Sequence, residues 1–225
     1  MQIDPAVLDF LHACGVRNLA ADRLDLLTRF LSDLRDANAH LNLTRITADA
    51  EFWTKHVADS LAVGLAFPEL LSTGLRAADV GCGAGFPAIP LAWANPALRI
   101  TGIEAVQKKA AFLQAEREAL GLANLAVLAL QAREAGRLPE YAGTCDAVLL
   151  RAVGGPATLV RDCRQLLRPG AGARLVFYMT PATVAEARPV AAREAHKYGL
   201  EVVESACLDL PCGAGTRQFL MLVRP

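Results

Sequence analysis

Hydrophobic residues in the first third of the chain recur at helical spacing. Between residues 18 and 38, leucines and a phenylalanine fall at intervals of three and four, the period of one helix face. A shorter apolar stripe covers residues 3–11, and a third stretch, 47–66, carries Trp53 and Val57 along one side. Stripes of this kind usually face a core, so we predict three helices before the first strand.

The pattern changes after residue 72. Short apolar runs, typical of buried strands, alternate with longer amphipathic stretches, and two apolar runs close the chain. This alternation predicts a parallel sheet covered by helices, and the closing pair predicts an antiparallel edge. The runs lie at 75–80, 98–103, 125–130, 145–150, 173–179, 201–210 and 217–223. We therefore expect an α/β, Rossmann-like domain with a seven-stranded sheet over residues 73–225, and an N-terminal helical cap over residues 1–72.

Three glycines follow the first predicted strand at alternate positions. The strand ends at Asp79 and Val80, and Gly81, Gly83 and Gly85 come directly after it. Glycine lets the backbone turn tightly and approach a ligand where a side chain would clash. A strand, a glycine-rich turn, a helix and a second strand make the layout of a nucleotide-binding βαβ unit. We predict that this turn holds a cofactor.

The details of the turn favour S-adenosylmethionine over a dinucleotide. A dinucleotide fingerprint has its third glycine where this chain has Phe86. Asp79 precedes the turn, and a carboxylate there would repel a phosphate but attract an ammonium or sulfonium group. Glu104 ends the second strand and can accept hydrogen bonds from both ribose hydroxyls. The cofactor-binding candidates are Asp79, Gly81, Gly83, Gly85, Phe86 and Glu104. A turn without a ligand and an NAD(P)-dependent oxidoreductase remain as alternatives.

Two further groups of polar residues have two interpretations each. His56 and Asp59 lie within a turn of each other on the third predicted helix. They are either a buried polar pair that pins the helix to the core or polar groups that face the cofactor cleft. Arg151 follows the fourth strand, and ligands of doubly wound sheets bind beyond such strand ends, so we expect it in the cleft. Arg161 and Arg164 are three residues apart on the next predicted helix. They either contact RNA phosphates or belong to a solvent-exposed basic face.

Composition and charge narrow the function classes. Lys+Arg and Asp+Glu balance at 23 each, which argues mildly against nonspecific nucleic-acid binding but leaves room for a local basic patch. The six cysteines show no Cys-x-x-Cys motif or metal-ligand spacing, so we expect reduced thiols, no metal and a cytoplasmic location. No apolar stretch approaches the roughly 20 residues of a membrane span and no signal pattern opens the chain, so we expect no membrane association.

Three motifs together resemble the small-subunit (16S) ribosomal RNA guanine-N7 methyltransferase family, also called glucose-inhibited division protein B. They are the Asn-Leu-Thr connector at 42–44, the His-x-x-Asp-Ser helix at 56–60, and the acid-x-Gly-x-Gly-x-Gly-x-Pro turn at 79–87, which continues into Ile-Pro-Leu at 89–91. The resemblance implies a class I methyltransferase that uses S-adenosylmethionine. It also implies ribosomal RNA or the small ribosomal subunit as partner, with no obligate protein partner.

The resemblance also assigns roles to individual residues. It implies contacts of Glu134 and Ala135 with the cofactor's adenine, and a cofactor or substrate contact for Arg151. We add His56, Arg161 and Arg164 as candidate contacts with RNA.

The chain departs from the family after the fifth strand. The family has a Lys-Gly pair there, and this chain reads Thr180-Pro181. Two alternatives therefore stay open: a methyltransferase of the same fold that acts on a small molecule or a protein, and a noncatalytic RNA-binding protein. The family's closing Arg-x-Leu strand is matched loosely from Arg217 onward.

The implied chemistry needs positioning rather than a general base. N7 of guanine has a free lone pair and no proton at neutral pH, so the enzyme has only to hold it in line with the methyl group. Positive charge moves onto the guanine ring, where a nearby oxygen would stabilise it. Asn42 and Asp59 are the candidates by motif position, and Arg151 completes the expected catalytic set. The expected target is a guanine in a single strand or loop.

Overall fold

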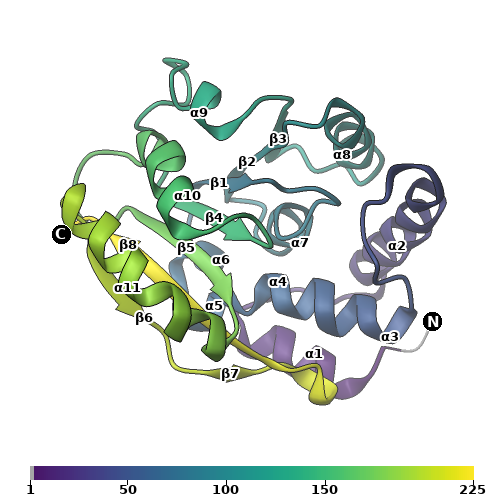
Figure 1. Cartoon of the computed structure of the whole chain (residues 1–225). Helices are drawn as coiled ribbons and strands as arrows, with labels where there is room; N and C mark the ends of the chain where they lie inside the picture. The colour runs from purple at the N-terminus through teal and green to yellow at the C-terminus, as the bar shows by residue number, and fades with distance from the viewer. Residues whose placement is uncertain (1–2) are drawn as a thin grey trace.

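The computed structural model, which describes residues 3–225, contains one mixed sheet (Figure 1). Its strand order is β3-β2-β1-β4-β5-β8-β6, and β7 pairs with β8 beside this path. The strands are β1 (Arg76–Val80), β2 (Arg99–Ile103), β3 (Leu125–Leu128), β4 (Ala147–Arg151), β5 (Arg174–Met179), β6 (Glu201–Glu204), β7 (Leu208–Asp209) and β8 (Thr216–Val223). The first five strands are parallel, and β8 is antiparallel to β5 and β6. The predicted α/β fold with seven strands is confirmed, except that the run 201–210 divides into β6 and β7.

Helices cover both faces of this sheet (Figure 1). They are α1 (Pro5–Ala13), α2 (Ala21–Leu41), α3 (Asp49–Glu51), α4 (Asp59–Leu61), α5 (Val63–Ala66), α6 (Glu69–Ser72), α7 (Ala88–Ala94), α8 (Gln107–Ala119), α9 (Ala132–Ala135), α10 (Pro156–Cys163) and α11 (Pro181–Lys197). One hydrophobic cluster joins α1, α2, α7 and α8 to the sheet, and a second lies under α9, α10 and α11. No described helix is long and apolar enough to cross a membrane.

The third predicted helix has an unexpected centre. Residues Phe52–Ala58, between α3 and α4, form a π-helix, and six of its seven residues are buried. The sequence predicted an amphipathic α-helix because its apolar stripe is clear, but burial on nearly every side overrides a single-face pattern. π-helical turns are rare and are frequent at functional sites. This segment carries His56 and leads directly into Asp59.

The helices before β1 do not form a separate core. Phe30 and Phe52 from this region share one cluster with Phe86 and with Phe219 of β8. The helical region is therefore packed against one face of the sheet and brings the end of the π-helix to the carboxyl ends of the strands. The division at residue 72 stays a prediction.

Candidate active site

A cavity of about 580 Å³ lies at the carboxyl ends of β1, β2, β4 and β5. Residues from seven parts of the chain line it: Leu43, Thr44, Arg45, Ile46, His56, Gly81, Cys82, Gly83, Ala84, Phe86, Glu104, Lys109, Arg151, Ala152, Tyr178 and Arg217. Doubly wound sheets bind their ligands at these carboxyl ends of the strands. The structure brings seven of the predicted site residues here: His56, Gly81, Gly83, Phe86, Glu104, Arg151 and, behind the surface, Asp59.

The glycine turn forms one side of the cavity, and its three glycines do different work. All three have positive φ, at 71° for Gly81, 52° for Gly83 and 95° for Gly85. A Cβ on Gly85 would lie 2.6 Å from Ile89 Cδ1, so this glycine is required by packing and does not line the cavity. A Cβ on Gly83 would meet nothing nearer than 3.8 Å, because this residue faces open space. A Cβ on Gly81 would lie 2.4 Å from Val153 Cγ1, so packing also requires this glycine, although it lines the cavity. Gly83 is therefore the glycine with open space for a ligand.

Glu104 is held in place at the end of β2 by backbone donors. Its Oε2 accepts a hydrogen bond from the Gly83 N–H at 2.9 Å, and its Oε1 accepts one from the Val106 N–H at 2.9 Å. Each carboxylate oxygen can accept more than one hydrogen bond. The side chain is thus oriented before any ligand arrives, with acceptor capacity left for hydroxyl groups. We call the turn Gly81–Phe86 together with Glu104 the glycine wall.

Asp79 does not line the cavity, contrary to our prediction of a direct contact with a cationic ligand. It is buried beneath the turn, and its Oδ2 accepts a hydrogen bond from the Ala88 N–H at 2.9 Å, at the start of α7. Burial raises its pKa to about 7, although the Ala88 N–H and the charge of Arg151 act in the opposite direction. A carboxylate at a helix N-terminus satisfies a free backbone N–H there. The motif position is correct, and the side chain caps a helix.

Three residues far apart in the chain form a second part of the cavity wall, where Arg151 and Arg217 line the cavity and Asp59 lies behind them. The guanidinium of Arg151 donates to Asp59 Oδ2 through Nε at 3.0 Å, and Arg217 donates to both Asp59 oxygens at 2.6 and 2.8 Å. Arg151 also donates to the Lys55 carbonyl at 2.7 Å. The Asp59 side chain is 2% exposed, against 14% for Arg151 and 17% for Arg217. We call these three residues the arginine wall.

The arginine wall carries excess positive charge. One carboxylate neutralises only one of its two guanidinium groups, and Arg45 and Lys109 add two more cations to the lining. Glu104 is the single carboxylate among the lining residues. The cavity therefore attracts anions. We predicted that Asp59 stabilises the charge on the guanine. Its oxygens are instead occupied by Arg151 and Arg217, so its position suits it to hold these arginines.

His56 packs between the two sides of the cavity. Its ring stacks on Phe86 with centroids 4.0 Å apart and planes 5° apart, and its Nε2 lies 3.0 Å from Thr44 Oγ1. Burial, with a contribution from the charge of Arg151, lowers the pKa of His56 to about 3, so the ring is neutral at physiological pH. His56 and Asp59 are both buried, as the first interpretation expected, but His56 makes no hydrogen bond to Asp59 and each has its own partners.

Asn42 lies outside the cavity. It is exposed and ends α2 in the left-handed region with φ 49°, a conformation that asparagine tolerates better than most residues. Asn38 organises the connector instead, because its Oδ1 accepts from the N–H groups of Leu43 and Thr44. Thr44 then reaches His56. The motif acts at the cavity through Thr44, and the structure gives no support to a catalytic Asn42.

Glu134 and Ala135 are also outside the cavity lining. Glu134 is exposed, and its Oε2 accepts from the Gln131 N–H at 2.8 Å in a capping box that starts α9. Ala135 is fully buried in the second hydrophobic cluster. Both residues are used by the local fold, so their contact with an adenine stays a prediction without geometric support.

Arg161 and Arg164 lie in a separate cavity of about 240 Å³ between α9 and α10. Arg161 pairs with its neighbour Asp162 at 2.9 Å, and the Arg164 guanidinium lies 4.4 Å from the centre of the Tyr198 ring. Arg133 and Arg137 of the α9 region line the same cavity. The structure does not bring these arginines to the active site, and their contact with RNA stays a prediction.

Arg217 and Tyr178 are the site residues that the sequence did not identify. Tyr178 is the fifth residue of β5, and its hydroxyl donates to the Ser60 carbonyl at 3.1 Å. β8 runs antiparallel to β5, and Gln218 lies opposite Met179, the last residue of β5. Arg217, the next residue toward the start of β8, therefore lies beside the end of β5, where the family's Lys-Gly dipeptide is missing. The Arg-x-Leu match at Arg217 was the available signal, but the strand pairing was needed to place it.

Comparison with known proteins gives one consistent family. A family model described as rRNA small subunit methyltransferase G matches residues 23–205. Ribosomal RNA small subunit methyltransferase G of Sorangium cellulosum is 44% identical over 159 residues, which cover 71% of this chain and 65%, just under two thirds, of that protein. The protein of the same name from Lactobacillus delbrueckii is 32% identical over 86% of this chain and 80% of its own length. In Lacticaseibacillus paracasei it is 34% identical over 98% of this chain and 90% of its own length.

Solved structures agree on the fold. A cofactor-bound protein from MTB superposes with a TM-score of 0.61 at 19% identity, over 99% of this chain and 98% of that chain. A SAM dependent methyltransferase from Aquifex aeolicus superposes with a TM-score of 0.56 at 14% identity, over 86% of this chain and 98% of that chain. At these identities the likeness establishes a shared Rossmann-like architecture.

Proposed function

The chain belongs to the rRNA small subunit methyltransferase G family, and we propose that it transfers a methyl group from S-adenosylmethionine to N7 of a guanine in 16S ribosomal RNA. The glycine wall holds the cofactor, and the arginine wall positions the RNA. The partner is ribosomal RNA or the small ribosomal subunit, and the cytoplasm is the expected location. The observation that carries the proposal is an oriented carboxylate, Glu104, beside an open glycine turn in a cavity that is also lined by Arg151 and Arg217.

The glycine wall fits S-adenosylmethionine better than a dinucleotide. Dinucleotide folds bind the pyrophosphate at the N-terminus of the helix that follows the glycine turn. In this chain the Oδ2 atom of Asp79 accepts the first N–H of α7, at Ala88, so that donor is already satisfied by the protein itself. Glu104 retains acceptor capacity for two ribose hydroxyls, and 580 Å³ lies within the usual range of ligand pockets.

When bound, the cofactor supplies a methyl group on a positively charged sulfur. The chain's own residues then have to exclude water, hold the guanine and tolerate the charge that moves onto it. No side chain has to remove a proton, because N7 carries none. This agrees with His56, which is neutral, engaged with Thr44 and therefore unsuited to proton transfer.

The arginine wall suits an RNA substrate. Guanidinium groups bind phosphates with paired hydrogen bonds, and their charge attracts a polyanion. Arg151 and Arg217 each direct two nitrogens to fixed protein acceptors, so their orientation is set before the substrate binds. Preorganised donors of this kind cost little reorganisation when a ligand arrives.

Methyl transfer to isolated ribosomal particles tests the proposal. Purified protein and labelled S-adenosylmethionine are incubated with small ribosomal subunits that lack the modification, and the RNA is then digested and its nucleosides identified by mass spectrometry. We expect one 7-methylguanine in the small-subunit RNA. Cofactor binding without label in RNA, or label in another base, would overturn the proposal.

A further inference from the structure

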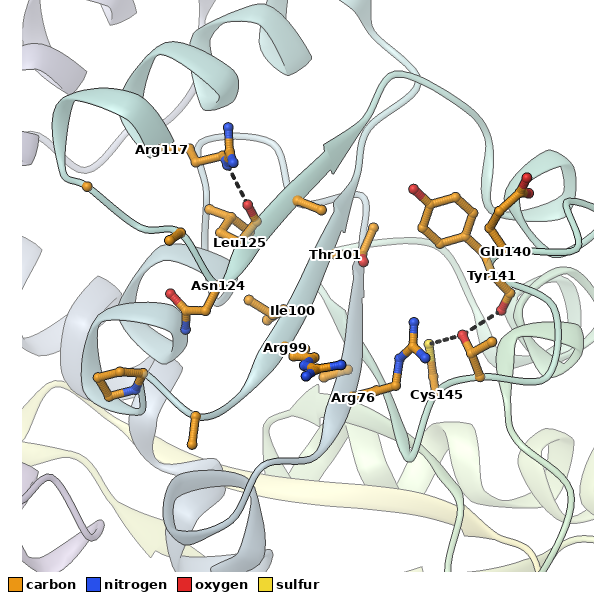
Figure 2. A pocket seen from close by; sticks show the side chains of 17 residues that line it. Arg76, Arg99, Ile100, Thr101, Arg117, Asn124, Leu125, Glu140, Tyr141 and Cys145 are labelled. Atoms are coloured by element: carbon orange, nitrogen blue, oxygen red, sulfur yellow. Dashed lines mark hydrogen bonds between the residues drawn. The ribbon is translucent and has the colours of Figure 1, made fainter.

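A second cavity, of about 830 Å³, lies at the amino-terminal ends of the parallel strands, whereas the active site lies at their carboxyl ends (Figure 2). Its lining includes the first residues of three neighbouring strands, Arg76 of β1, Arg99 of β2 and Leu125 of β3. The active site lies beyond the last residues of β1 and β2. Each of β1 and β2 is five residues long, so the two sites are separated by roughly 17 Å of sheet.

Two arginines dominate this second cavity. Arg76 and Arg99 are direct partners in the register of β1 and β2, and both side chains are exposed. Like charges at opposed positions of a sheet repel each other. Among residues 3–225, neither guanidinium has a carboxylate partner, because the nearby Asp146 accepts from the Arg76 backbone N–H and from Arg168. The sheet thus presents two adjacent cations that lack neutralising groups.

The other lining residues add one more cation and an aromatic ring. Arg117 of α8 donates through Nε to the Leu125 carbonyl at 2.6 Å, and Glu140 is the single carboxylate of the lining. The backbone of Tyr141 is fixed, since Thr144 Oγ1 donates to its carbonyl at 2.9 Å and its own N–H donates to Leu138. Figure 2 shows the Tyr141 ring turned toward the strand that carries Thr101.

We propose that this second cavity binds a nucleotide of the RNA substrate, with its phosphate on Arg76 and Arg99 and its base against Tyr141. Two guanidinium forks match the geometry of a phosphate, and unstacked RNA bases commonly stack on aromatic side chains. Binding of a phosphate would also relieve the repulsion between the two arginines. The inference rests on the proposed function, since only an RNA that reaches both ends of the parallel strands can couple this cavity to catalysis.

The test compares two double variants of the full chain. Arg76→Gln with Arg99→Gln removes the cavity's opposed cations, and Arg17→Gln with Arg193→Gln removes two exposed arginines elsewhere as a matched control. Binding of a single-stranded oligoribonucleotide from small-subunit RNA is measured at several salt concentrations, together with kcat, KM and affinity for S-adenosylhomocysteine. Thermal melting establishes that all proteins are folded.

We expect the cavity variant to bind RNA about tenfold more weakly, with a plot of log affinity against log salt that is less steep by about 0.7, the value for one lost single-strand phosphate contact. KM for RNA should rise by a similar factor, while kcat and S-adenosylhomocysteine affinity stay unchanged. Equal RNA affinity and salt slope in the cavity variant and the control would overturn the inference.

A second pair of variants tests the aromatic part. Tyr141→Phe keeps the ring and should retain RNA affinity, whereas Tyr141→Ala should lose it several-fold. Binding of AMP tests whether the cavity binds a free nucleotide instead of RNA. If AMP binds the wild type but not the cavity variant, while both proteins bind RNA equally well, the RNA assignment is overturned.

The two proposals can fail separately. Cavity-dependent RNA binding by a protein that transfers no methyl group would overturn the proposed function alone. Methyl transfer with equal KM in wild type and the cavity variant would overturn the inference alone.

Discussion

The two walls of the active site are built in different ways. The glycine wall comes from one continuous segment, 81–104, and is held by backbone N–H groups and by glycine conformations. The arginine wall joins Asp59 to Arg151 and Arg217, which lie 92 and 158 residues after it in the chain. These three residues contact one another through their side chains alone. A wall made of backbone tolerates single side-chain changes, whereas a wall made around one buried carboxylate depends on that carboxylate. The following predictions test this difference.

Removal of the Asp59 carboxylate should have the largest effect. Asp59→Ala leaves two largely buried guanidinium groups without their anion, and breaking a buried ion pair in this way costs about 3–5 kcal/mol. Urea denaturation measures the loss. Asp49→Ala is the matched control, because its ion pair with Arg35 is half-exposed and should contribute less than about 1 kcal/mol. Equal effects of the two substitutions would contradict the dependence of the arginine wall on Asp59.

Asp79 should make stability fall as the pH rises. Burial raises its pKa from 3.8 to about 7, so the folded protein retains a proton that the unfolded chain has lost. Its stabilising contribution is complete below about pH 4 and is lost as the pH rises toward 7, with a slope of up to about 1.4 kcal/mol per pH unit. Asp79→Asn keeps an oxygen for the Ala88 N–H and should remove this dependence.

Urea denaturation of wild type and Asp79→Asn at pH 5 and pH 8 checks the prediction. The pKa of His56 is lowered by burial, so its stabilising contribution is lost as the pH falls below 6.5. This contribution is common to both proteins and cancels in their difference. Parallel stability curves for the two proteins would show that Asp79 does not titrate in this range.

Replacement of Glu104 should affect the cofactor rather than the fold. Glu104→Gln keeps the shape of the side chain but removes the charge that strengthens hydrogen bonds to hydroxyl groups, each of which contributes about 1.5–3 kcal/mol. We expect S-adenosylmethionine affinity to fall about 10- to 100-fold by calorimetry. RNA affinity measured without cofactor should not change. Unaltered cofactor affinity would remove Glu104 from the glycine wall's function.

Two alanine substitutions in the glycine turn should separate packing from ligand contact, with the smallest effects of the series. A Cβ at position 85 meets Ile89 and Leu113 at 2.6 and 2.9 Å, so Gly85→Ala should lower stability by about 1–3 kcal/mol through overpacking, in addition to the cost of a positive φ that both positions share. Gly83→Ala adds a methyl group in open space and costs only about 1–2 kcal/mol for its positive φ. Cofactor affinity, corrected for stability, should fall for Gly83→Ala alone.

The sequence predicted the elements whose signals are local. The strands, the glycine turn, Glu104 and Arg151 follow from apolar runs and from residues directly after them. The structure places them as expected, except that the run 201–210 divides into β6 and β7. Orientation was harder to predict. Asp79 and Asn42 stand at informative positions, but one side chain caps α7 and the other ends α2 at the surface.

Features that depend on tertiary contacts were not available from the sequence. The π-helix at Phe52–Ala58 carries an apolar stripe that also fits an α-helix, and its burial on nearly all sides comes from tertiary contacts. Arg217 enters the active site only because β8 pairs with β5, and Arg76 meets Arg99 only through the register of β1 with β2. Each of these contacts joins residues that are distant in the chain, and a single sequence carries no direct record of such pairing.

The division of work between the walls is tested most directly by Arg217→Gln, whose side chain lines the cavity from β8. Steady-state methyl transfer to small-subunit RNA gives KM for the RNA and kcat, and calorimetry gives S-adenosylmethionine affinity. We predict a rise of about tenfold in KM for RNA, as for a lost charge-assisted contact, and cofactor affinity within about twofold of wild type. A variant that loses cofactor affinity and keeps KM for RNA would contradict the account.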